Sequence, residues 1–81
     1  MSMEYEISET LDVRGASCPI PVVKTKQTID DLDVGDVLEV LATDSGSMSD
    51  IDGWARATDG VDLLEQFDDD GVYKHYVRKT A

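Results

Sequence analysis

The residue best suited to covalent chemistry is Cys18, which precedes Pro19-Ile20-Pro21. Proline favours the first position of a helix, so this spacing predicts a helix that begins at Pro19 with Cys18 as its N-cap. Since neither proline has an N–H, the amide of Ile20 is the donor left within reach of the sulfur. The positive end of a helix lowers the pKa of a nearby thiol. We therefore expect a reactive thiolate held in place by Gly15, Pro19 and Pro21.

Three cations lie close to this cysteine in the sequence: Arg14, Lys24 and Lys26. Positive charges favour a thiolate, so we expect them to give the site electrostatic support. The alternative is an inert cysteine packed between helix and sheet, because unpaired cysteines are often small buried hydrophobes.

His75 is the only histidine, and it lies in a segment with strand character. An ordinary strand histidine is therefore favoured over a Cys–His pair with Cys18. A single cysteine excludes an internal disulfide and a zinc site built from several cysteines. The run Asp68-Asp69-Asp70-Gly71 lacks the alternating spacing of a calcium loop and predicts a turn. We expect neither a metal nor a cofactor.

The elements that position the thiol follow from the periodicity of apolar residues. Their order predicts one domain over residues 1–81, an α/β (α+β) two-layer sandwich of order β-α-β-α-β-β. Two helices would cover one face of a four-stranded mixed sheet and leave the other face to solvent or a partner. The expected elements are a strand over 5–13, a helix from Pro19 through Leu32, a central strand over 37–42, a helix from Ser47 to about Asp59, and strands over 61–67 and 72–79.

The second helix has a start signal in Ser47 and Asp50, whose spacing is typical of a capping box. Because these side chains would satisfy the free amides at the helix start, we expect the preceding Asp44-Ser45-Gly46 loop to be a bare cap and not an anion site. Trp54 falls on the apolar stripe of this helix, which favours a core position over a ligand platform.

The charge of the chain restricts its partners. Eighteen Asp and Glu oppose seven Lys and Arg, a formal charge of −11, so nucleic acid and anionic membranes would be repelled. Salt screens such self-repulsion, which suggests a salt-loving host. Neither a basic, apolar leader nor a membrane-length apolar run is present, so we expect a cytoplasmic protein. The basic residues Lys74, Arg78 and Lys79 favour cross-strand pairing with carboxylates over a docking patch.

The run Leu11–Pro21 with the following Val22-Val23-Lys24-Thr25-Lys26 resembles the Cys-Pro-x-Pro signature of the TusA/SirA-type sulfur-carrier family. Family members are similar in length and share the β-α-β-α-β-β sandwich. Ser17 and Ser49 stand where some members have Arg, and Ser45 where Pro is often found. The likeness extends through Val34-Gly35-Asp36, Ala42-Thr43-Asp44, Asp50-Ile51 and Tyr73–Lys79.

This resemblance implies a sulfurtransferase in which Cys18 accepts sulfane sulfur from a cysteine desulfurase or another persulfide donor protein. The sulfur would travel as a persulfide to a downstream acceptor protein, in tRNA thiolation, molybdenum cofactor synthesis or related sulfur trafficking. Ile20 lies off the buried stripe beside the thiol and is a candidate docking residue. Two alternatives stay open: a redox or regulatory adaptor acting through mixed disulfides of Cys18, and an interaction module with a buried Cys18.

Overall fold

Strands and helices follow one another in the order β-α-β-α-β-β in the computed structural model, which describes residues 5–81. This order is the one that the apolar periodicity predicts. The elements are β1 (Glu9–Val13), α1 (Ile20–Asp30), β2 (Val37–Ala42), α2 (Ser47–Ala57), β3 (Val61–Asp69) and β4 (Val72–Lys79).

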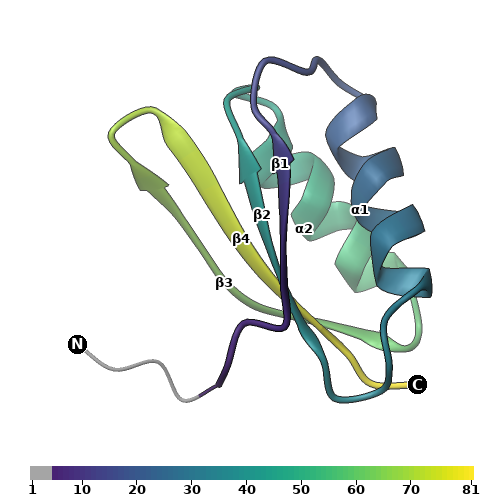
Figure 1. Cartoon of the computed structure of the whole chain (residues 1–81). Helices are drawn as coiled ribbons and strands as arrows, with labels where there is room; N and C mark the ends of the chain where they lie inside the picture. The colour runs from purple at the N-terminus through teal and green to yellow at the C-terminus, as the bar shows by residue number, and fades with distance from the viewer. Residues whose placement is uncertain (1–4) are drawn as a thin grey trace.

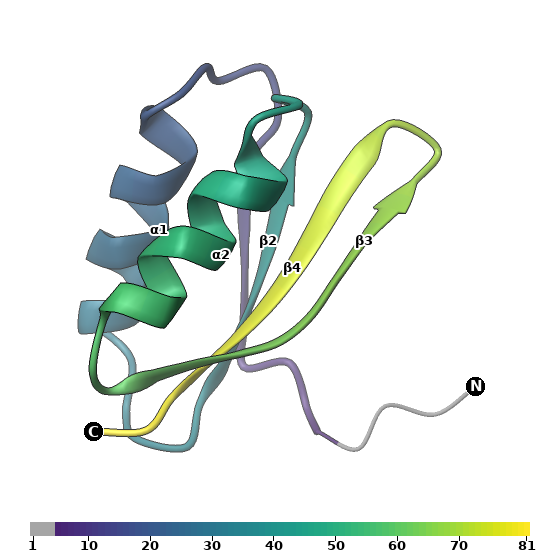
Figure 2. The same cartoon turned by 180° about the vertical axis from the view of Figure 1, so that it is seen from behind.

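The strands form one sheet in the order β1-β2-β4-β3. β1 runs parallel to β2, whereas β4 is antiparallel to both β2 and β3. Both helices cover the same face of this sheet, as Figure 1 shows and the reverse view in Figure 2 confirms. The expected fold class, a two-layer α+β sandwich with two helices on a four-stranded mixed sheet, is confirmed.

The core lies between the helices and the facing side of the sheet. Alternate residues of β2, namely Leu38, Val40 and Ala42, point to this side and are fully buried. Ile29 of α1 and Ile51 of α2 pack against the same cluster. The predicted central strand therefore has both the bounds and the burial that its apolar run indicates.

The two helices are shorter than the sequence predicts, because α1 ends at Asp30 and α2 at Ala57. Trp54 is a partly buried residue that packs against the core, as its place on the apolar stripe of the second helix predicts. Neither helix among residues 5–81 has the length and apolar character needed to cross a membrane.

The first strand is also shorter than predicted, because β1 begins at Glu9. The Ser8 amide still donates to the Val37 carbonyl (2.8 Å), but the regular pairing ends there. The Val37 amide donates to the Ser8 side-chain oxygen (3.1 Å) instead of to a backbone carbonyl. Tyr5 then packs against Tyr76, with ring centroids 6.0 Å apart, and its hydroxyl donates to Glu65 (2.9 Å). The aromatic contact and this hydrogen bond hold Tyr5 by side-chain interactions in place of a longer parallel ladder.

The β3–β4 hairpin has a tighter turn than the four-residue connection predicted. β3 extends to Asp69, which leaves Asp70 and Gly71 as the loop. Both have positive φ, 54° and 91°, as a two-residue turn that matches the strand twist requires. Gly71 tolerates this conformation because it has no Cβ.

Candidate functional site

Two loops meet at one edge of the sheet. β1 and β2 are parallel and each is followed by a helix on the same face, so their carboxyl ends point to the same edge. The loop over residues 14–19 and the loop over residues 43–46 therefore lie next to each other, beside the first turns of α1 and α2 (Figures 1 and 2). Cys18 belongs to the first loop.

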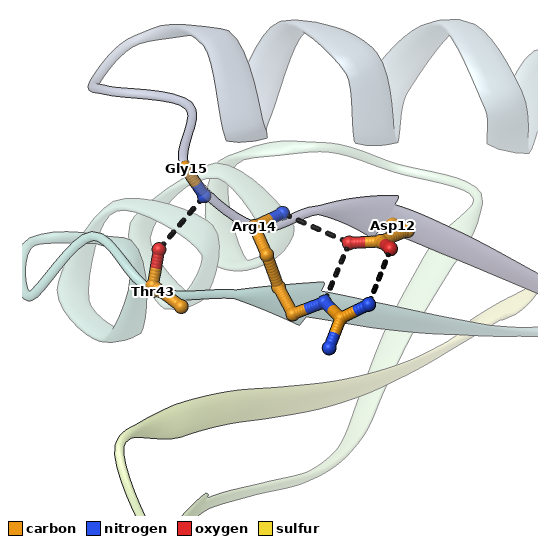
Figure 3. A network of polar contacts seen from close by, with 4 residues as sticks. All are labelled: Asp12, Arg14, Gly15 and Thr43. Atoms are coloured by element: carbon orange, nitrogen blue, oxygen red, sulfur yellow. Dashed lines mark hydrogen bonds and ion pairs between the residues drawn. The ribbon is translucent and has the colours of Figure 1, made fainter.

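Polar contacts hold the Cys18 loop to the sheet (Figure 3). Gly15, whose φ is +86°, donates its amide to the Thr43 hydroxyl at the end of β2 (2.8 Å). The Arg14 guanidinium makes two hydrogen bonds to the Asp12 carboxylate, 2.9 and 2.8 Å long. Arg14 is thus engaged by Asp12, and this pairing lowers the pKa of Asp12 to about 2.

The predicted N-cap role of Cys18 is wrong. The N-cap is Pro19, α1 begins at Ile20, and the Cys18–Pro19 peptide bond is cis. The Ile20 amide donates to the backbone carbonyl of Ser17 (2.9 Å), which is a stronger acceptor than a thiol sulfur. Pro21 is buried in the first turn. Cys18 therefore sits one residue before the cap, in the loop.

Cys18 is exposed, so the alternatives with a buried cysteine are wrong. The predicted lowering of its pKa is wrong as well. Interaction with the Asp50 carboxylate, partial desolvation and the charge of Asp44 raise the pKa of Cys18. The charges that act on the thiol are thus these carboxylates and not the nearby cations.

The carboxylates of Asp44 and Asp50 both lie close to Gly46. A Cβ on Gly46 would lie 3.2 Å from Asp44 Oδ2 and 3.4 Å from Asp50 Oδ2. Asp44 Oδ2 is shielded from solvent and accepts no hydrogen bond from residues 5–81. Within the same range, no three His, Cys, Asp or Glu side chains are grouped so that they could hold a metal ion. The pair is a local concentration of negative charge, and both carboxylates raise the pKa of Cys18.

This pair is the site feature that the sequence analysis missed. Asp50 was assigned to a capping box with Ser47, but α2 has Gly46 at its N-cap and no capping side chain. The topology could have indicated the Asp44 and Asp50 pair, because two loops that follow neighbouring parallel strands must meet at one edge of the sheet.

Ser47 is buried and contacts His75 instead of capping α2. Its hydroxyl lies 3.3 Å from His75 Nε2, and the Gln66 amide nitrogen lies 2.9 Å from His75 Nδ1. An amide N–H can only donate, so Nδ1 accepts and the ring proton is on Nε2. Gln66 Nε2 also donates to the Met48 carbonyl, which fixes its orientation.

His75 is fully buried, and burial lowers its pKa to about 4. Its two ring nitrogens are engaged by Ser47 and Gln66, so the ring is a neutral structural group at pH 7. The favoured interpretation as a strand histidine is confirmed.

Of the three basic residues of β4, Lys74 alone forms the expected ion pair with a carboxylate among residues 5–81. Lys74 forms an ion pair with Asp69 (3.0 Å), as cross-strand pairing predicts. Lys79 Nζ donates to the carbonyls of Asp30 and Leu32, at 3.2 and 2.8 Å, and so satisfies acceptors at the end of α1.

Exposed apolar side chains flank the thiol on α1. Ile20 is 48% exposed and Val23 is 44% exposed, one helical turn apart. Lys24 and Lys26 are exposed on the same helix. The surface around Cys18 thus combines a thiol, two carboxylates and an apolar pair.

Comparison with known proteins places these features in a family context. The family model described as sulfurtransferase TusA matches residues 9–79. A Halobacterium salinarum protein named as a candidate sulfur carrier is 72% identical over 80 residues, or 99% of each chain. Its source fits the expected salt-loving host. The sulfur carrier protein TusA of Allochromatium vinosum is 35% identical, over 93% of this chain and 97% of its own.

A solved structure agrees with this comparison at the level of the fold. The crystal structure of a SirA-like protein from Desulfitobacterium hafniense superimposes with a TM-score of 0.77 and 28% identity. The match covers 90% of this chain and 99% of that one.

Proposed function

Since the chain belongs to the TusA family of sulfur carriers, we propose that it carries sulfane sulfur as a persulfide on Cys18. The observation that supports this role most directly is the exposed thiol of Cys18, on a loop that hydrogen bonds hold to the sheet edge. An exposed, positioned thiol can meet the sulfur of a second protein without local unfolding.

The proposed reaction conserves atoms and electron pairs. The Cys18 thiolate attacks the terminal sulfur of a persulfide on the donor, R–S–SH. A new S–S bond forms at Cys18 while the donor's S–S bond breaks, and the donor leaves as a thiolate that takes up the proton. The products are Cys18–S–SH and R–SH, so no external oxidant or reductant is needed. The same exchange passes the sulfur to an acceptor thiol.

The remaining residues have supporting roles in this proposal. Gly15 permits the turn that brings the loop to Thr43, and Pro19 and Pro21 restrict the backbone after the thiol. Ile20, with its exposed side chain, is the proposed docking contact.

A sulfur carrier works between a donor and an acceptor protein. We propose a cysteine desulfurase or another persulfide protein as the donor. For the acceptor we propose a protein of tRNA thiolation, molybdenum cofactor synthesis or related sulfur trafficking in the cytoplasm. Residues 1–81 would act as one sulfurtransferase domain.

The test is the intact mass of the protein after incubation with a cysteine desulfurase and cysteine in about 1 M salt, which screens the acidic surface. We expect the added mass of one sulfur atom, removable by reductant and absent from Cys18→Ser. A wild-type protein that alkylates readily at Cys18 but gains no sulfur from persulfide donors would contradict the carrier role and favour the mixed-disulfide adaptor.

A further inference from the structure

One hydrogen bond ties the loop that carries Cys18 to the neighbouring loop. The Gly15 amide donates to the Thr43 hydroxyl at the end of β2 (2.8 Å, Figure 3). In the described part of the chain, no other hydrogen bond joins residues 14–19 to residues 43–46. The amides on either side of Gly15 donate to residues of β1 instead, so they close the turn on its own strand.

A second anchor lies after the thiol. The Ile20 amide donates to the Ser17 carbonyl (2.9 Å), and Pro21 is buried in the first turn of α1. Cys18 therefore lies on a short exposed segment between the Thr43 hydrogen bond and the start of α1. Without the Thr43 bond, this segment would be tied to β1 and to α1 but not to the loop beside it.

The loop that carries Thr43 is fixed at both ends. At its start it continues from the central strand β2, and at its end the buried Ser47 hydroxyl lies 3.3 Å from His75 Nε2. The Gln66 amide nitrogen contacts both His75 Nδ1 (2.9 Å) and the Met48 carbonyl (2.8 Å). These contacts hold the start of α2 to β3 and β4, so Thr43 offers the Cys18 loop a fixed point of attachment.

We propose that Thr43 is a positioning residue for sulfur transfer: its hydroxyl, through the Gly15 amide, sets the orientation in which Cys18 meets the persulfide of a protein donor. This inference rests on the proposed function and adds to it a residue on which a protein donor, but not a small reagent, depends. A protein donor presents its sulfur in one orientation, and a misplacement of about 1 Å lowers such a rate strongly. A small reagent approaches an exposed thiol from many directions, so it does not need this orientation.

The hydrogen bond of Thr43 can be removed without much effect on the fold. Gly15 and Thr43 are both exposed, so water can satisfy the amide when the hydroxyl is absent. Thr43→Val keeps the shape of the side chain and its preference for a strand, whereas Thr43→Ser keeps the hydroxyl. The two variants therefore separate the hydrogen bond from the bulk of the side chain.

The first experiment measures sulfur loading from a persulfide-charged cysteine desulfurase as the carrier concentration is varied, in about 1 M salt to screen the acidic surface. We expect Thr43→Val to lower the saturating rate about fivefold, because the net contribution of one hydrogen bond corresponds to roughly that factor in a local equilibrium. The half-saturating concentration should stay the same, since the exposed apolar pair Ile20 and Val23 is untouched. Thr43→Ser should load like wild type.

Thr10→Val is the matched control. It makes the same substitution at an exposed threonine of β1, whose hydroxyl donates to Glu39 (3.0 Å), and it should leave loading unchanged. Alkylation of Cys18 by neutral iodoacetamide should proceed at the same rate in all four proteins. Unchanged loading in Thr43→Val, a change confined to its half-saturating concentration, or loading and alkylation that slow together would overturn the proposal. So would a Thr43→Ser protein that loads as slowly as Thr43→Val.

The second experiment does not depend on sulfur transfer. Hydrogen exchange of the Gly15 amide, followed by NMR, should be several-fold faster in Thr43→Val than in wild type, Thr43→Ser or Thr10→Val. Equal exchange in all four proteins would overturn the proposal, because the loop would then not be held by Thr43 in solution. If wild type itself fails to load, the proposed function fails, whereas the exchange rates still decide whether Thr43 holds the Cys18 loop.

Discussion

Mild acid should destabilise this protein through His75. The ring is fully buried and neutral, and burial lowers its pKa from 6.5 to about 4. Protonation would place a charge in the core, and it would also put a proton on Nδ1, which accepts from Gln66. The unfolded chain takes up this proton far more readily, so proton binding favours unfolding.

The sign and size of the effect follow from the two pKa values. Because the folded pKa is the lower one, the stabilisation is complete above pH 6.5 and is lost as the pH falls toward 4. The shift from 6.5 to about 4 is worth at most about 3 kcal/mol, at about 1.4 kcal/mol for each tenfold difference in proton affinity. A small domain is stable by roughly 5–15 kcal/mol, so this loss is a large share.

An opposing effect must be suppressed in the assay. Acid also neutralises carboxylates, which relieves the repulsion in a chain of net charge −11 and stabilises the fold. In about 1 M salt the Debye length is roughly 3 Å, so this contribution is small. Urea unfolding, followed by the fluorescence of Trp54, would give the free energy of unfolding between about pH 7 and pH 4.5 under these conditions.

The control is His75→Gln, which has no group that titrates in this range. Wild type should lose stability as the pH falls, whereas the variant should start less stable at pH 7 and change little. A wild-type free energy of unfolding that is level across this range, or a fall of equal size in the variant, would refute the assignment to His75.

Two further predictions concern a pair of glycines and the docking surface. Gly53→Ala in α2 adds a methyl group with nothing within 4 Å, so it should raise the free energy of unfolding by about 0.5–1 kcal/mol. Gly71→Ala, at φ +91°, should lower the free energy of unfolding by about 1 kcal/mol. Urea unfolding that ranks the two variants in the opposite order would contradict the backbone argument. Ile20→Asp should slow sulfur loading from a cysteine desulfurase several-fold without lowering stability, whereas Val34→Asp, at a 64% exposed position in the turn after α1, should leave loading unchanged. Equal rates for the two Asp variants would remove Ile20 from the docking surface.

Local patterns were reliable where one short-range rule decides the structure. The apolar run over Val37–Ala42 predicts the central strand with its observed bounds, because a strand with neighbours on both edges and helices on one face is mostly apolar. Ile29 and Ile51 follow from helical spacing in the same way. These patterns need no knowledge of distant residues.

Predictions were wrong where a residue distant in the sequence offered a side chain a stronger contact than its local neighbours did. Ser47 has the spacing of a capping residue, yet its hydroxyl contacts His75, because a buried imidazole needs a partner more than an exposed helix end does. Tyr5 has the alternation of a strand residue, yet it packs on Tyr76 and donates to Glu65. In both cases a contact with a residue distant in the sequence outweighed the local preference.

The sequence by itself determined the order of the elements, the two-layer sandwich and the choice of Cys18, since these depend on periodicity, turn residues and a single thiol. Only the tertiary structure decided the environment of that thiol. Neighbouring parallel strands bring the loops after β1 and β2 to one edge, where the charges of Asp44 and Asp50 raise the pKa of Cys18. Charge interactions act through space over a few ångströms, so the sign of the pKa shift followed the folded neighbours and not those in sequence.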